Sequence, residues 1–162
     1  MRKILNTLSH ELVLKLKLNN LKLGTAESCT GGMLAQYLTM HPGSSKTYNY
    51  GYVTYSNQSK IDILKVKKSD IDNYGAVSKE VSSAMAFNLI KDNNIDISIA
   101  VSGIAGPGGG SIEKPLGLVH HALATKQYLI HKEIVYEGNR EAVRQQTVET
   151  CLKLLLKEIN KL

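Results

Sequence analysis

Apolar residues recur along the first segment at the three- and four-residue spacing of a helix. They are Ile4, Leu5, Leu8, Leu12, Val13 and Leu16. This repeat predicts a helix that stops at Asn19-Asn20. A short strand over Leu21–Thr25 is expected next, and a turn over residues 27–32 feeds a second helix from about Gly32 to Met40. Strand, small-residue turn and helix together form half of a βαβ unit.

Strand-like and helix-like patterns alternate along the rest of the chain. Strands are predicted at Tyr50–Tyr55, Ile97–Val101, Leu116–Thr125 and Tyr128–Val135, and helices at Lys79–Asp92 and Arg140–Ile159. A short helix carrying Lys60 in its first turn is expected to be capped by Ser56 or Asn57. The alternating order predicts an α/β fold, a single three-layer domain over residues 1–162 with a mixed β-sheet covered by helices.

Composition narrows the classes of function. The chain has 162 residues, 43% of them hydrophobic, enough for one domain with its own core. Its net charge of +6 suits a phosphorylated ligand or simply a solvated surface, and no basic run is interleaved with aromatics, so no nucleic acid partner is expected. Only Cys29 and Cys151 occur, without metal-ligand spacing. No signal or membrane segment is recognisable, which predicts a cytoplasmic protein without a membrane partner.

A glycine-rich loop runs from Gly103 to Pro115. It lacks the Gly-Lys-Ser/Thr ending of a P-loop, and a strand rather than a helix follows it, so it is no dinucleotide fingerprint. Because the loop follows a buried strand, it can be a ligand-binding lid or a plain structural turn.

Thr30-Gly31-Gly32 lies between a strand and a helix, where unpaired amides favour an anion. The alternative is a helix cap formed by Ser28 or Thr30. Cys29 is a rival nucleophile, because a helix start can lower the pKa of a thiol, or else a buried structural cysteine.

Arg140 and Arg144 share one face of the last predicted helix. Together they offer forked donors to a phosphate or carboxylate. The alternative is a solvated surface on which they pair with Glu137 or Glu141.

Ser45, Tyr55 and Lys60 bring a hydroxyl, a phenol and an amine into one short stretch. Such a set can support nucleophilic catalysis without a metal or a histidine. A lysine has a reference pKa of about 10.4, and the dipole of a helix start lowers it by less than about one unit. Burial or a second positive neighbour must supply the rest. From spacing alone, the alternative is a turn serine, a strand tyrosine and a surface lysine.

Longer motifs follow one another in a defined order. They are Thr25–Gly32 (TAESCTGG), Gly43–Ser45 (GSS), Val53–Asn57 (VTYSN) with Lys60, Gly75–Ser78 (GAVS), Val101–Pro107 (VSGIAGP) and Lys114–Gly117 (KPLG). With these motifs, from about Leu5 to Leu156, the chain closely resembles the CinA C-terminal domain family, the nicotinamide-nucleotide amidases. Family members often carry this domain behind a larger N-terminal domain related to molybdopterin-binding proteins, and the chain resembles the stand-alone form.

The resemblance implies hydrolysis of the carboxamide of nicotinamide mononucleotide to nicotinic acid mononucleotide and ammonia, with no metal and no other cofactor. It implies that Ser45 is the nucleophile and that Tyr55 and Lys60 transfer its proton, in an arrangement similar to serine β-lactamases. The substrate-binding residues that it implies are Thr30, Gly31, Gly32, Gly106, Gly108, Gly109, Arg140 and Arg144. A homodimer is expected from the family. The alternative is a non-catalytic nucleotide-binding module, or a regulatory module related to competence or DNA damage.

Overall fold

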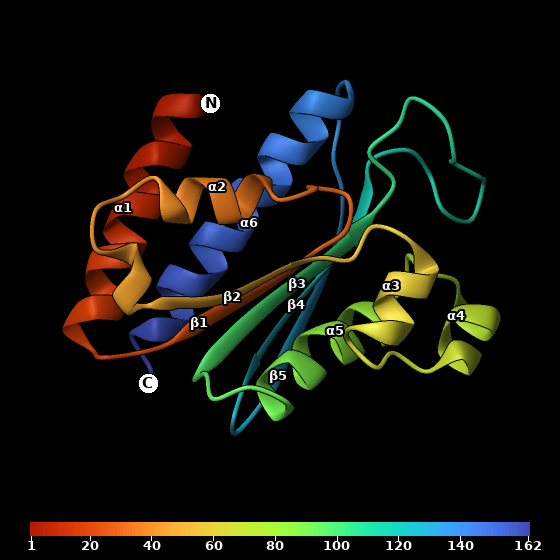
Figure 1. Cartoon of the computed structure of the whole chain (residues 1–162). Coiled ribbons are helices and arrows are strands. Elements are labelled where there is room, and N and C mark those ends of the chain that lie inside the picture. Colours follow the sequence, from red (N-terminus) through yellow and green to blue (C-terminus); the bar gives the residue numbers. More distant parts are fainter.

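A five-stranded sheet forms the centre of the molecule in the computed structural model, which describes residues 1–162 (Figure 1). The strands are β1 (Leu23–Glu27), β2 (Tyr48–Val53), β3 (Ile97–Gly103), β4 (Leu118–Thr125) and β5 (Leu129–Val135). Their order is β2-β1-β3-β4-β5. Strand β1 is parallel to β2 and β3, whereas β4 is antiparallel to β3 and β5. The mixed sheet predicted from the sequence is therefore confirmed.

Helices cover both faces of this sheet. They are α1 (Arg2–Leu18), α2 (Met33–Thr39), α3 (Asn57–Asp62), α4 (Lys68–Tyr74), α5 (Lys79–Lys91) and α6 (Arg140–Ile159), with a 3₁₀ turn, η1 (Ser44–Lys46), before β2. Helices α1, α2 and α6 pack on one face, and α3, α4 and α5 lie on the other (Figure 1). The predicted three-layer α/β architecture is confirmed.

The two faces of the sheet differ in the size of the side chains that they present. In β3, Val101 packs into the core beneath α1 and α6, whereas Ala100 faces α5. Ser98 also lies on the α5 side, where its hydroxyl donates a hydrogen bond to the Ala86 carbonyl at 2.7 Å. Small side chains allow a helix to approach a sheet closely. This packing fixes the beginning of α5 beside the carboxyl end of β3.

Two short elements, η1 and α4, are absent from the sequence prediction. Each is too short to show a full hydrophobic repeat. Helix α3 begins as expected, because the Ser56 hydroxyl accepts a hydrogen bond from the Ser59 amide at 3.0 Å. No helix combines the length and the apolar character needed to cross a membrane.

Candidate active site

The candidate site lies where the parallel strands β1 and β2 end. Ser28 directly follows β1, and Lys60 belongs to α3, which follows β2. Because the two strands are parallel neighbours, the residues after their carboxyl ends meet at one edge of the sheet. In Figure 1 this edge lies between the start of α2 and helix α3.

Lys60 contacts Ser28 directly. The Lys60 Nζ lies 3.0 Å from the Ser28 Oγ and 2.7 Å from the Thr54 carbonyl, with the Tyr55 carbonyl at 3.4 Å. A neutral amine at this position can donate its two N–H groups to the carbonyls and accept the hydroxyl proton of Ser28 with its lone pair. The pair has the geometry of a nucleophile with its general base.

The Lys60 side chain is 1% exposed. Burial disfavours the charged ammonium and lowers the pKa of Lys60 to about 8, against a smaller opposing effect of Cys29. At that pKa about one lysine in ten is neutral at pH 7. The condition that the sequence placed on Lys60, burial or a positive neighbour, is met by burial.

A pocket of about 210 Å³ opens beside this pair. Its lining residues are Ser28, Cys29, Tyr55, Asn57, Lys60, Ala76, Val77, Ser102, Gly103, Ala105 and Arg140. The Tyr55 Oη accepts a hydrogen bond from Arg140 Nη2 at 2.8 Å. Since the phenol oxygen accepts from arginine, its own proton remains free to be donated into the pocket.

Arg140 also closes the side of the pocket that faces the glycine-rich loop. Its Nη1 donates to the Gly106 carbonyl at 2.8 Å. A second pocket of about 630 Å³ lies beyond, and Gly106 lines it together with Arg140 and Ala105. Ala105 and Arg140 line both pockets, so the two are adjoining. Gly108 and Gly109 are exposed and line neither of them.

Ser45 does not join Tyr55 and Lys60 in the chain. It is exposed in η1, before β2, whereas the other two residues follow β2. Strand β2 separates them by roughly 16 Å, at about 3.3 Å per residue. The predicted grouping of Ser45 with Tyr55 and Lys60 is therefore wrong within one chain. The strand β2 lies between the two motifs and places them at its opposite ends.

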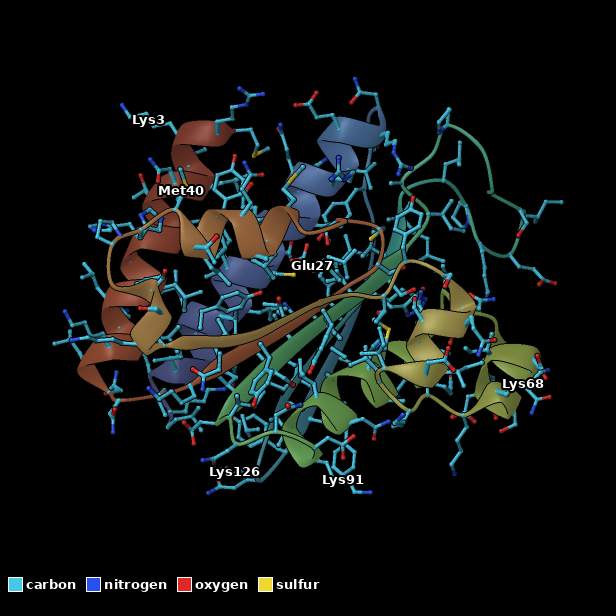
Figure 2. The ribbon with its side chains drawn as sticks, in the orientation of Figure 1. Lys3, Glu27, Met40, Lys68, Lys91 and Lys126 are labelled. Atoms are coloured by element: carbon cyan, nitrogen blue, oxygen red, sulfur yellow. The ribbon has the colours of Figure 1, made fainter.

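The Glu27 carboxylate occupies the beginning of α2. Its oxygens accept hydrogen bonds from the Thr30 hydroxyl at 2.7 Å, the Gly32 and Leu34 amides at 3.0 Å each, and the Ala35 amide at 2.8 Å. Glu27 is 1% exposed, and Figure 2 shows it between α2 and the sheet. The Thr30 hydroxyl and the Gly32 amide therefore already serve this internal anion, which argues against their binding an external one, whereas the Thr30 amide donates to no backbone carbonyl.

Gly31 and Arg144 belong to the same structural unit. Gly31 has a left-handed φ of 59°, which suits the turn, and Arg144 Nη2 donates to the Thr30 carbonyl at 2.6 Å. Arg144 is partly buried and lines neither pocket. Of the two predicted phosphate-binding arginines, only Arg140 therefore borders the site.

Cys29 lines the pocket but is a poor nucleophile. Burial raises the pKa of its thiol to about 12, so the reactive thiolate is scarce at neutral pH. Both cysteines are free and buried, so the expected burial of Cys29 is confirmed. No group of three or more His, Cys, Asp or Glu side chains could hold a metal ion.

From the sequence, Ser28 is expected only as a possible cap of the second helix, and no role is expected for Glu27. A usable signal was present for Ser28, because it is the first residue after a buried strand. That position usually borders the ligand site of an α/β sheet. The partnership of Ser28 with Lys60 has no local signal, since 32 positions separate them.

Comparison with known proteins places this geometry in a family. The model of the CinA C-terminal domain matches residues 5–159. The chain belongs to the CinA C-terminal domain family. Competence-damage inducible proteins of Clostridium botulinum (strain Langeland) and Thermoanaerobacter pseudethanolicus are 46% and 44% identical over 86% and 90% of the chain. The chain spans about a third of the length of these curated relatives, 34% and 35%.

Solved structures agree with the family over nearly the whole chain. The competence/damage inducible protein CihA from Agrobacterium tumefaciens is 38% identical, with a TM-score of 0.93 over 97% of this chain and 96% of that one. A CinA superfamily protein from Escherichia coli is 36% identical, with a TM-score of 0.90 over 94% and 88% of the two chains. The family resemblance stated from the motifs is thereby confirmed.

Proposed function

We propose that the chain is a serine amidase that hydrolyses the carboxamide of nicotinamide mononucleotide to nicotinic acid mononucleotide and ammonia. The observation that carries this proposal is the 3.0 Å contact between the buried Lys60 amine and the Ser28 hydroxyl at the edge of a pocket. An alcohol paired with a largely desolvated amine is a competent acyl-transfer nucleophile. Ser28 thus takes the role that the family resemblance implies for Ser45.

The reaction proceeds in two halves. Neutral Lys60 removes the Ser28 proton as Oγ attacks the carboxamide carbon, and the resulting ammonium returns a proton to the nitrogen that leaves as ammonia. An ester then links Ser28 to the nicotinoyl group. Water, deprotonated by Lys60, attacks this ester and releases the carboxylic acid together with the free serine hydroxyl.

Backbone amides next to Ser28 support the proposal. Neither the Cys29 nor the Thr30 amide donates to a backbone carbonyl. The amide that follows a nucleophilic serine in a strand-to-helix turn is a common oxyanion donor. The Tyr55 phenol, whose oxygen accepts from Arg140, can relay the proton to the leaving nitrogen: it gives its own proton to that nitrogen and is reprotonated by the Lys60 ammonium.

The size and chemistry of the two pockets support a mononucleotide substrate. The smaller one, about 210 Å³, is walled by small apolar groups such as Ala76 and Ala105 and is suited to a flat carboxamide ring. The larger one, about 630 Å³, adjoins it and offers room for a ribose phosphate. Arg140 lies between them and is the preferred phosphate ligand, because each of its Nη atoms donates one hydrogen bond, to Gly106 or to Tyr55, and keeps a second N–H for a phosphate.

The test is ammonia release from nicotinamide mononucleotide by the purified protein, with nicotinamide riboside as the substrate that lacks the phosphate. We expect turnover of the mononucleotide, a much higher KM for the riboside, and no turnover by Ser28→Ala. Mononucleotide that binds tightly without releasing ammonia would instead favour the non-catalytic binding module.

A further inference from the structure

The glycine-rich loop between β3 and β4 is attached to a second loop by one side chain. Lys114, near the end of the glycine-rich loop, extends to the turn that joins α4 to α5. Its Nζ donates to the Tyr74 carbonyl at 2.5 Å and to the Val77 carbonyl at 2.7 Å. Charge-assisted hydrogen bonds of this kind are stronger than neutral ones.

The four successive carbonyls of residues 74–77 are each held by a side chain. Lys114 binds those of Tyr74 and Val77, and the Ser78 hydroxyl donates to the Gly75 carbonyl at 2.8 Å. The remaining carbonyl, that of Ala76, accepts from the Ser102 hydroxyl at 2.7 Å. A turn without secondary structure of its own is thereby ordered by contacts from two other segments, β3 and the glycine-rich loop.

Gly75 is required for the approach of Lys114. Its φ of 75° lies in the left-handed region that only glycine adopts readily. A Cβ at this position would lie 2.8 Å from Lys114 Nζ and would push the ammonium away from its acceptors. The turn and the lysine are thus matched, since the residue without a side chain stands where a Cβ would contact the amine.

The turn forms one wall of the smaller pocket. Ala76 and Val77 line it together with Ser28 and Lys60. Neither the Ala76 nor the Val77 amide donates to a backbone carbonyl, so the wall also carries free hydrogen-bond donors. A shift of this wall would change the fit of a bound ring but would leave the Ser28 and Lys60 contact intact.

We propose that Lys114 is a positioning residue that ties the glycine-rich loop to the Gly75–Ser78 turn and so sets the substrate wall of the pocket. The inference rests on the proposed amidase function for its kinetic consequence and on the hydrogen bonds alone for the tie itself. Lys114 acts through the position of the Ala76 and Val77 backbone. Its loss therefore weakens substrate binding and spares the chemical step.

The experiment measures both consequences in Lys114→Ala. Hydrogen exchange is expected to accelerate at the Gly75, Val81 and Ser82 amides, which flank the turn and donate to the Ile71 carbonyl, the Ser78 hydroxyl and the Ser78 carbonyl. KM for nicotinamide mononucleotide is expected to rise about 10-fold, with kcat within about 3-fold of wild type. Lys114→Arg should restore much of the affinity, since a guanidinium can also donate to two carbonyls. Gly75→Ala should reproduce the effect, and Lys132→Ala, an exposed lysine on β5, should do nothing.

Four results would separate the possibilities. Unchanged amide exchange in Lys114→Ala would refute the tie, and faster exchange with unchanged KM would refute the positioning role. A fall in kcat that accompanies a fall in the free energy of unfolding, with KM unchanged, would show that Lys114 is merely a structural residue. A wild-type protein that releases no ammonia would count against the amidase proposal alone, because amide exchange still decides whether Lys114 holds the turn.

Discussion

The two ends of β2 carry similar residues but differ in their surroundings: the candidate site lies after the strand, and the exposed Ser45 lies before it. Before the strand, η1 carries Ser45 on an exposed turn, and no hydrogen bond joins its hydroxyl to a lysine. After the strand, Lys60 is buried against Ser28 beside a pocket. Both ends contain serine and lie close to lysine in sequence, yet only one adjoins the carboxyl end of a second parallel strand. The comparison shows that chain topology, rather than proximity in sequence, selects the partner of a nucleophile.

The largest expected effect is the difference between the two serines. Ser28→Ala should lower kcat/KM at least about 1,000-fold, because no other nucleophile is in contact with Lys60. Ser45→Ala should stay within about 2-fold of wild type. Ammonia release measures both variants, and mass spectrometry after a serine-reactive sulfonyl fluoride should find the label on Ser28. Label on Ser45 with lost activity would reverse the assignment, for instance through a site shared between two chains.

Lys60→Met should lower kcat about 100- to 10,000-fold, since it removes the general base while keeping an unbranched side chain of similar length. In the wild type, kcat/KM should rise with pH and level off above about pH 8, where Lys60 becomes neutral. The pH profile of ammonia release checks this. A level profile from pH 6 to pH 9 would exclude Lys60 as the titrating base.

Lys60 also makes the free energy of unfolding depend on pH. The pKa of Lys60 falls from 10.5 to about 8 on folding, so between these pH values the unfolded chain binds more protons. The free energy of unfolding of wild type relative to Lys60→Met should therefore increase across this window, by about 3 kcal/mol in all, and should be constant below pH 8. Urea unfolding of both proteins at several pH values measures the difference.

Glu27→Gln tests whether the start of α2 is a structural unit and not a substrate site. The variant keeps the shape but loses the charge that accepts four hydrogen bonds. We expect about 2 kcal/mol less stability in urea unfolding, because hydrogen bonds to charged groups each contribute about 1.5–3 kcal/mol and a neutral amide keeps part of them. Unchanged stability together with a raised KM would restore the anion-site interpretation.

The smallest effect separates the two arginines. Arg140→Ala should raise KM for the mononucleotide about 10-fold and leave KM for the riboside nearly unchanged, since it removes a phosphate contact of about 1.4 kcal/mol. Arg144→Ala should lower stability without this selectivity, because Arg144 holds the Thr30 carbonyl inside the fold. Equal changes for both substrates in Arg140→Ala would remove the phosphate role.

Prediction from sequence succeeded where a residue's environment follows from its neighbours along the chain. The repeat from Ile4 to Leu16 is helical, and Ser56 caps α3. The pattern of the final helix gave its bounds, Arg140–Ile159, as the structure has them. The demand that Lys60 be buried or lie beside a second positive group followed from charge energetics alone, and burial meets it. Each of these depends on local geometry or on a general property of one side chain.

Tertiary structure decided what the sequence left open. The motifs were enough to identify the family and the α/β class, and to point to Lys60 and Tyr55. They did not show that Ser28 is the hydroxyl beside Lys60, that Glu27 fills the amides of α2, or that Lys114 spans two loops. The reason is physical. Hydrogen bonds and burial act over about 3 Å in space, and parallel strands place residues distant in sequence at one edge while carrying near neighbours to opposite ends.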